Sequence, residues 1–66
     1  MKFIVEEGSG FGYQVRSARR VQGHYLYVRY MFKGQPDLTV DYGHGKYYKC
    51  KASAVRAAEL ASRAEV

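Results

Sequence analysis

Tyrosine and arginine side chains alternate with apolar ones near the middle of the chain, where residues 24–33 read HYLYVRYMFK. In an extended strand, successive side chains point to opposite faces, so Tyr25, Tyr27 and Arg29 share one face. Arginines neutralise phosphates, and tyrosine rings stack on unpaired bases at about 1–3 kcal/mol per base. This spacing therefore predicts a surface suited to binding nucleic acid.

Further basic and aromatic residues extend this candidate surface. Arg16 lies on the expected strand at 11–18, and Arg19 and Arg20 lie in the connection that follows this strand. Lys46, Tyr48 and Lys49 precede an expected helix, whose N-terminal backbone N–H groups favour anions. The lysines before the helix also suit a solvated edge that prevents sheets from aggregating. The candidate contact residues are Arg16, Arg19, Arg20, Tyr25, Tyr27, Arg29, Lys46, Tyr48 and Lys49.

The charge of the chain permits several partners. Eleven Lys and Arg residues against six Asp and Glu give a net charge of +5, and the sequence pI is about 9.6. A pI above about 9 is the footprint of a nucleic-acid-binding domain, but an acidic protein or an anionic membrane surface also fits it. A net charge of about 2–8 also serves solubility alone.

Tyrosine and arginine have a second and a third interpretation. Both side chains are amphipathic, so they can cover a sheet face that simply meets water. Exposed tyrosine and arginine are also typical of protein–protein hot spots. Contact with nucleic acid, contact with protein and a solvated face therefore all stay open.

Catalytic and metal-binding patterns are weak. Asp41, His44, His24 and Cys50 are of zinc-ligand type, but they lack paired-ligand spacing. Cys50 has no orienting partner for nucleophilic chemistry. The glycines at 8–10 precede an expected strand and not a helix, so they do not form a phosphate loop. We expect no enzyme activity, no cofactor and no metal.

Length and cysteine content favour one small cytoplasmic domain spanning 1–66. A single cysteine excludes an internal disulfide, on which small secreted domains usually depend. The apolar run at 1–5 is shorter than the roughly 7–15 residues of a signal-peptide core. No run approaches the roughly 18 apolar residues of a membrane span, so we expect no membrane partner.

The residue pattern predicts an α+β fold, in which a small antiparallel sheet of three to five strands carries one C-terminal helix on one face. The helix begins after Ser53 as its N-cap, and its alanines at 54, 57, 58, 61 and 64 form one stripe. Strands are expected at 2–6, 11–18, 24–33 and 38–42, with turns at 8–10, 34–37 and 43–45, and 46–50 is a short strand or an extended approach to the helix.

Small helix residues require large sheet residues opposite them. The expected core side chains of the sheet are Leu26, Val28, Tyr30, Phe32, Leu38 and Val40. Met31 would then lie on the other face, beside the tyrosines and arginines.

An Ala-rich helix entered through 48–54, YKCKASA, and continuing AAELA at 57–61 follows three expected strands. Over roughly 24–64 this resembles the amino-terminal arm-binding domain of phage tyrosine integrases. That resemblance implies a three-stranded sheet docked in a DNA major groove, with Arg16, Tyr25, Tyr27 and Arg29 facing DNA. The same region is similar to the carboxy-terminal half of double-stranded-RNA-binding domains, whose lysine pair Lys49 and Lys51 approximate.

Two functions follow as expectations. The first is a small, stand-alone, basic module that binds nucleic acid, with DNA favoured over RNA. The alternative is a protein encoded by a phage or mobile element that binds and inhibits a host complex, for example in defence or transcription. Pairing of an exposed edge strand across a two-fold axis would give a homodimer.

Overall fold

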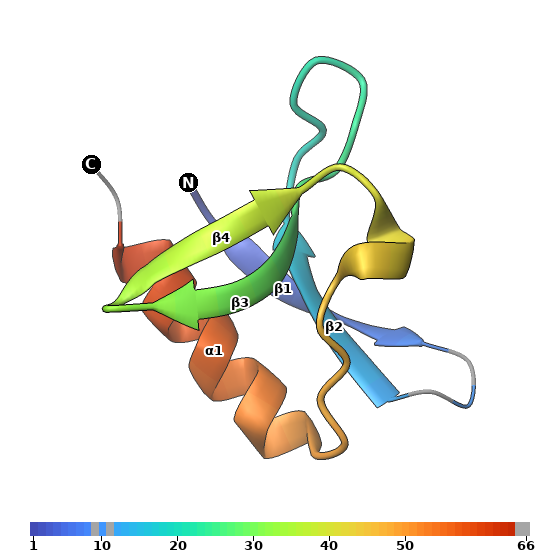
Figure 1. Ribbon diagram of the computed structural model, residues 1–66, viewed down its shortest axis with the longest axis vertical. Helices are drawn as coiled ribbons and strands as arrows, with labels where there is room; N and C mark the ends of the chain where they lie inside the picture. Colours follow the sequence, from blue (N-terminus) through green and yellow to red (C-terminus); the bar gives the residue numbers. More distant parts are fainter. Residues whose placement is uncertain (9, 11, 65–66) are drawn as a thin grey trace.

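The protein folds into a four-stranded antiparallel sheet with one helix on its face (Figure 1). The computed structural model describes residues 1–8, 10 and 12–64. The strand order is β1-β2-β3-β4, so β1 and β4 are the edges. The predicted α+β class is confirmed. The elements are β1 (Phe3–Gly8), β2 (Gly12–Ser17), β3 (Tyr27–Phe32), β4 (Gln35–Thr39), the 3-10 helix η1 (Tyr42–His44) and α1 (Lys51–Arg63).

The segment before α1 connects the two halves of the sheet. Tyr13 N–H donates to the Tyr48 carbonyl at 2.8 Å, and Tyr48 N–H donates back at 2.7 Å, which extends the edge of β2. Lys46 N–H donates to the Val28 carbonyl of β3 at 3.0 Å. The segment 46–50 is therefore an extended approach to the helix that bridges β2 and β3, one of the two predicted alternatives.

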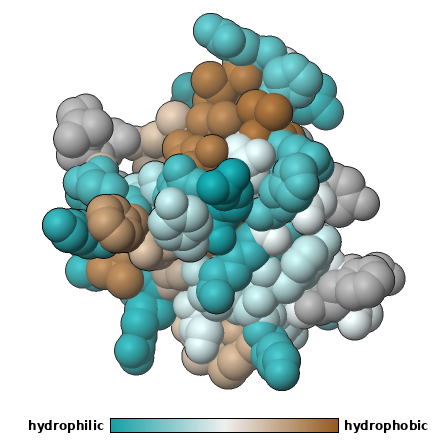
Figure 2. Space-filling model, in the orientation of Figure 1, coloured by the Kyte–Doolittle hydropathy of each residue, from teal (hydrophilic) through white to brown (hydrophobic). Residues whose placement is uncertain are grey.

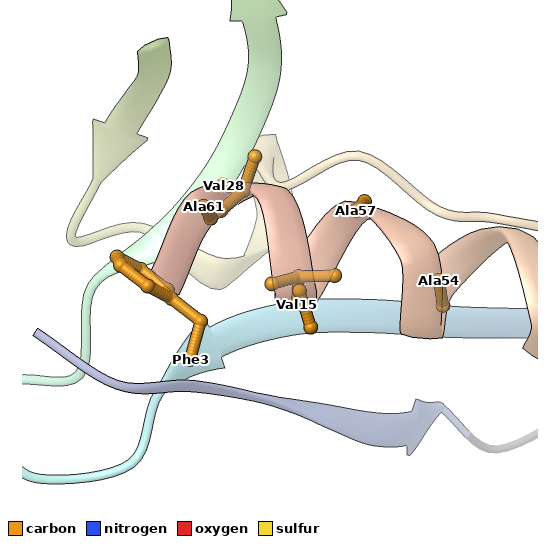
Figure 3. Close-up of a cluster of buried hydrophobic side chains, with 7 residues drawn as sticks. Phe3, Val15, Val28, Ala54, Ala57 and Ala61 are labelled. Atoms are coloured by element: carbon orange, nitrogen blue, oxygen red, sulfur yellow. The ribbon is translucent and has the colours of Figure 1, made fainter. Parts of the chain in front are cut away.

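The core lies between α1 and the inner face of the sheet (Figure 3). The predicted alanine stripe is buried at 54, 57, 58 and 61, while Ala64 follows the end of the helix and is half-buried. Phe3, Val15 and Val28 fill the opposite side of the core. The helix lies mainly over β1 and β2, so these strands supply more of the large side chains than we expected.

The predicted alternation along β3 is correct only as far as Val28. Val28 pairs with Leu38, but the next pair is Tyr30 with Asp37, so Arg29 is an extra residue in a β-bulge. A bulge shifts the side-chain alternation by one residue. The remaining residues of β3 are therefore reversed, contrary to the prediction: Tyr30 and Phe32 are 45% and 61% exposed, whereas Met31 packs against the core.

Turn geometry corrects the predicted boundaries of β4. Lys33 and Gly34 both have positive φ, 51° and 79°, as a two-residue hairpin turn requires. The strand therefore begins at Gln35 and includes Pro36, which an edge strand tolerates. Val40 follows the strand and is 58% exposed, so its predicted place in the core is wrong.

The starts of β3 and α1 also differ from the prediction. Residues 21–24 form a tight turn in which Gln22 and Gly23 have positive φ, so β3 begins at Tyr27 and not at residue 24. Leu26, expected in the core, precedes the strand and is half-buried. The helix begins at Lys51 with Cys50 in the N-cap position, which places Ser53 inside the first turn. No helix in the described ranges is long and apolar enough to cross a membrane.

Gly12 allows the chain before α1 to approach β2 closely. Its φ is +115°, and a Cβ atom there would overlap the Tyr48 carbonyl oxygen. We expect Gly12→Ala to lower the free energy of unfolding by about 2 kcal/mol or more, because it adds a backbone clash to an unfavourable φ. Urea denaturation followed by circular dichroism measures this loss.

Gly23→Ala is the matched control, since Gly23 has a φ of +85° but open space around it. It should cost only the conformational penalty of about 1–2 kcal/mol. Equal losses in the two variants would contradict the close approach at Gly12.

Candidate functional site

The candidate site is the sheet face opposite α1, called here the outer face. Its side chains alternate with those of the core, and the bulge adds Arg29 and Tyr30 together. The residues that define the outer face are Glu6, Arg16, Tyr27, Arg29, Tyr30, Phe32 and Asp37.

Arg16 is fixed at the centre of this surface. Its Nε lies 3.1 Å from Glu6 Oε1, and its Nη1 donates to the Ser17 carbonyl at 3.0 Å. Its guanidinium carbon is 4.1 Å from the centre of the Tyr25 ring, and its register partner on β3 is Tyr27. Because the side chain is only 17% exposed and paired with a carboxylate, Arg16 positions its neighbours more than it offers free charge.

Buried Ser17 shapes the connection between β2 and β3, residues 18–26. Its hydroxyl donates to the Arg19 carbonyl at 2.7 Å and accepts a hydrogen bond from Leu26 N–H at 3.0 Å. The connection extends beyond the sheet at the top of the view (Figure 1). As a result the Arg20 guanidinium lies 5.4 Å from the Tyr25 ring centre, so two arginines contact one tyrosine.

Tyr27 completes the cluster around Glu6. Its hydroxyl donates to Glu6 Oε1 at 3.4 Å. Burial first, and then the negative charge of Glu6, raise the pKa of the Tyr27 phenol above its ordinary value. The structure thus brings together four predicted site residues. Arg16 and Tyr27 contact Glu6, a carboxylate that the sequence did not single out, and Tyr25 and Arg20 join them through the contact of Arg16 with the Tyr25 ring.

A second aromatic group lies at the β3–β4 hairpin. Arg29 Nε is 2.9 Å from Asp37 Oδ2, and its guanidinium carbon is 5.7 Å from the Tyr30 ring centre. Lys33 Nζ is 5.5 Å from the centre of the Phe32 ring.

Sequence reasoning missed Tyr30 and Phe32 because it extended one strict alternation through the whole stretch. Counting back from a two-residue turn at 33–34 would have placed Phe32 opposite Gln35, on a polar face. The polar residues Gln35 and Asp37 of β4 were therefore the sequence signal that Phe32 and Tyr30 lie on the outer face.

The other predicted site residues lie apart from the outer face. Tyr48 packs against the core on the side of α1, and burial raises its pKa. Lys46 Nζ lies 5.4 Å from the Tyr48 ring centre, and Lys49 is exposed just before α1. The expected contact surface thus divides, and these three residues form a separate group at the start of the helix.

Unneutralised positive charge flanks the outer face. Arg16 and Arg29 each have a carboxylate partner. Within the described part of the chain, no ion pair engages Arg19, Arg20 or Lys33, and all three are exposed. On the face in view, apolar side chains gather in small patches within a largely hydrophilic surface (Figure 2). Free cations at two ends of an aromatic surface suit an anionic, ring-containing partner.

The residues considered for metal binding do not gather. His44 Nδ1 lies 3.1 Å from Asp41 Oδ2, but no group of three potential ligands occurs in residues 1–8, 10 and 12–64. Cys50 is exposed, and the backbone N–H groups of Ser53 and Ala52 lower the pKa of its thiol.

Comparison of this chain with protein-family models, curated proteins and solved structures finds no match. The resemblance to integrase arm-binding domains therefore stays a prediction.

The raised pKa of Tyr27 predicts a loss of stability in alkali. Because this pKa is higher in the folded state than the ordinary value of 10.0, the phenol stabilises the fold below pH 10, and that contribution is lost as the pH rises further. We expect Glu6→Gln to let Tyr27 ionise at lower pH, since it removes the nearby negative charge. Ultraviolet difference titration against Tyr27→Phe isolates this phenol.

Tyr48 is the internal control, because burial alone raises its pKa. Its titration, isolated with Tyr48→Phe, should not respond to Glu6→Gln. An unchanged Tyr27 titration in Glu6→Gln would contradict the contact between the phenol and the carboxylate.

Proposed function

We propose that this chain is a small nucleic-acid-binding module that contacts DNA or RNA through the outer face and the adjoining connection 18–26. The observation that carries the proposal is the cluster in which the guanidinium groups of Arg16 and Arg20 lie 4.1 Å and 5.4 Å from the Tyr25 ring centre. Arg16, which is paired with Glu6, holds the Tyr25 ring in place, and Arg20 lies over the same ring without an ion pair among the described residues. The cluster therefore presents a positioned cation for contact with a phosphate.

The distribution of charge supports this proposal. Arg19 and Arg20 lie at one end of the outer face and Lys33 at the hairpin turn, where they are exposed to solvent. Glu6 and Asp37 hold Arg16 and Arg29 in defined positions. The net charge of +5 adds a long-range attraction for a polyanion. Two arginines in fixed positions, with exposed cations on either side of them, form a surface that suits contact with successive phosphates of a nucleic acid.

Salt dependence tests the proposal directly. We expect the logarithm of the binding constant to fall linearly with the logarithm of salt concentration, with a slope of about −0.9 per phosphate contacted on a duplex and about −0.7 on a single strand. Arg20→Ala should weaken binding and make this slope shallower by about one contact. Fluorescence anisotropy with labelled oligonucleotides measures both quantities.

Arg56→Ala is the control of equal charge, because Arg56 is exposed on α1, which covers the opposite face of the sheet. Its effect should be limited to the small change that net charge produces. No binding to DNA or RNA at low salt would reject the proposed function.

Removing a carboxylate from the outer face should strengthen binding. Asp37→Asn frees Arg29, whose Nε lies 2.9 Å from Asp37 Oδ2, for contact with a phosphate. We expect a severalfold increase in affinity and a steeper salt dependence, because a cation is no longer compensated. The same anisotropy titration compares the variant with the unmodified chain.

Glu59→Gln makes the same change of charge on the exposed side of α1 and should leave affinity nearly unchanged. Weaker binding in Asp37→Asn would argue that the ion pair, and not free charge, is what the partner recognises.

A protein partner is the second candidate function. Its specific support is that two outer-face arginines already have carboxylate partners, while Tyr30 and Phe32 are exposed. Exposed aromatics beside compensated arginines are also typical of protein hot spots. A partner captured from host lysate that persists after nuclease treatment, together with no affinity for purified oligonucleotides, would favour the alternative of an inhibitor of a host complex.

A further inference from the structure

We infer that Tyr30 and Phe32 form a stacking platform for unpaired bases, so that the preferred ligand of the outer face is a single-stranded nucleic acid. This inference rests on the proposed function and narrows it. It depends on the bulge at Arg29, which turns both rings away from the core.

Exposure and spacing suit the two rings to stacking. Tyr30 is 45% exposed and Phe32 is 61% exposed, and both lie in β3 after the bulge. Residues two apart on a strand lie on one face with Cα atoms about 6.6–6.8 Å apart. Neighbouring bases of a flexible single strand can separate to that spacing, with one base on each ring.

A duplex cannot use the same platform. Its bases are stacked about 3.4 Å apart along each strand, and their faces are hidden while only their edges reach the grooves. A pair of exposed rings on a short hairpin would meet sugar and phosphate on a duplex, with little gain. Single strands offer the base faces that aromatic side chains bind.

A cation lies over each of the two rings. The Arg29 guanidinium carbon is 5.7 Å from the Tyr30 ring centre, and Lys33 Nζ is 5.5 Å from the Phe32 ring centre. A nucleotide stacked on either ring would bring its phosphate near one of these charges. The rings therefore have the complementary charge that a nucleotide requires, which a purely apolar docking surface would lack.

The edge of β4 is a poorer contact for a partner. Pro36 lies within this edge strand and has no N–H group to donate, which interrupts any added strand. The partner that the hairpin fits therefore lies across its outer face and not along its edge. That face continues along β3 through Tyr27 toward Tyr25 and Arg20, where the proposed phosphate contacts lie.

Anisotropy titrations of the unmodified chain with single-stranded DNA, single-stranded RNA and the DNA duplex of one sequence test the inference. We expect the affinity for either single strand to exceed the affinity for the duplex by about tenfold or more. Tyr30→Ala and Phe32→Ala should each weaken single-strand binding by about fivefold to a hundredfold, in line with the cost of losing one stacked base. Duplex affinity should change by less than about twofold, because a duplex presents no unpaired base face to either ring.

Two further variants separate stacking from simple apolar contact. Phe32→Tyr keeps an aromatic face and should retain affinity, whereas Phe32→Leu keeps an apolar side chain and should lose it. Leu60→Ala is the matched control, since Leu60 is 44% exposed on α1. Circular dichroism confirms that these surface variants stay folded.

The outcomes distinguish this inference from the function on which it rests. The duplex could bind as tightly as the single strands or more tightly, with the single-strand affinity unchanged in Tyr30→Ala and Phe32→Ala. That result would overturn the stacking platform and leave nucleic-acid binding intact. Full affinity in Phe32→Leu would also overturn it. Absence of binding to all three oligonucleotides would reject both.

Discussion

The close approach of α1 to the sheet is the constraint on which the rest of this structure depends. Four buried alanines of the helix pack against large side chains of the sheet, chiefly Phe3, Val15 and Val28. Small residues facing large ones allow dense packing between two layers. The helix covers one face of the sheet, and on the other face Tyr30 and Phe32 are exposed to solvent.

The Glu6 carboxylate organises the part of that other face formed by β1, β2 and the start of β3. Glu6 accepts from Arg16 at 3.1 Å and from the Tyr27 hydroxyl at 3.4 Å, and Arg16 in turn lies against the Tyr25 ring. Such a network fixes side chains that would otherwise be mobile, at the cost of compensating one positive charge. Among the described residues, exposed cations without an ion pair lie at the two ends of this face: Arg19 and Arg20 at one end and Lys33 at the other. The outer face therefore combines aromatic rings held in place with exposed positive charge at its two ends.

The bulge at Arg29 connects fold and function most directly. One extra residue keeps Val28 in the core while directing both Arg29 and Tyr30 to the outer face, and Phe32 follows. Bulges bend a strand and redirect side chains in this way. Without it, Tyr30 and Phe32 would lie on the same face of the sheet as Val28.

The sequence by itself determined the class of fold, the alanine face of the helix and the polarity of the first part of β3, because these follow from local periodicity and side-chain size. It also identified Arg16, Arg20, Tyr25 and Tyr27 as candidates, though not the carboxylate of Glu6 that joins them. Only the tertiary structure decided the register beyond Val28, the start of β4 at Gln35 and the position of Tyr48 on the side of the helix. The physical reason is that a bulge and a two-residue turn are settled by pairing between strands, and pairing depends on residues distant in the chain.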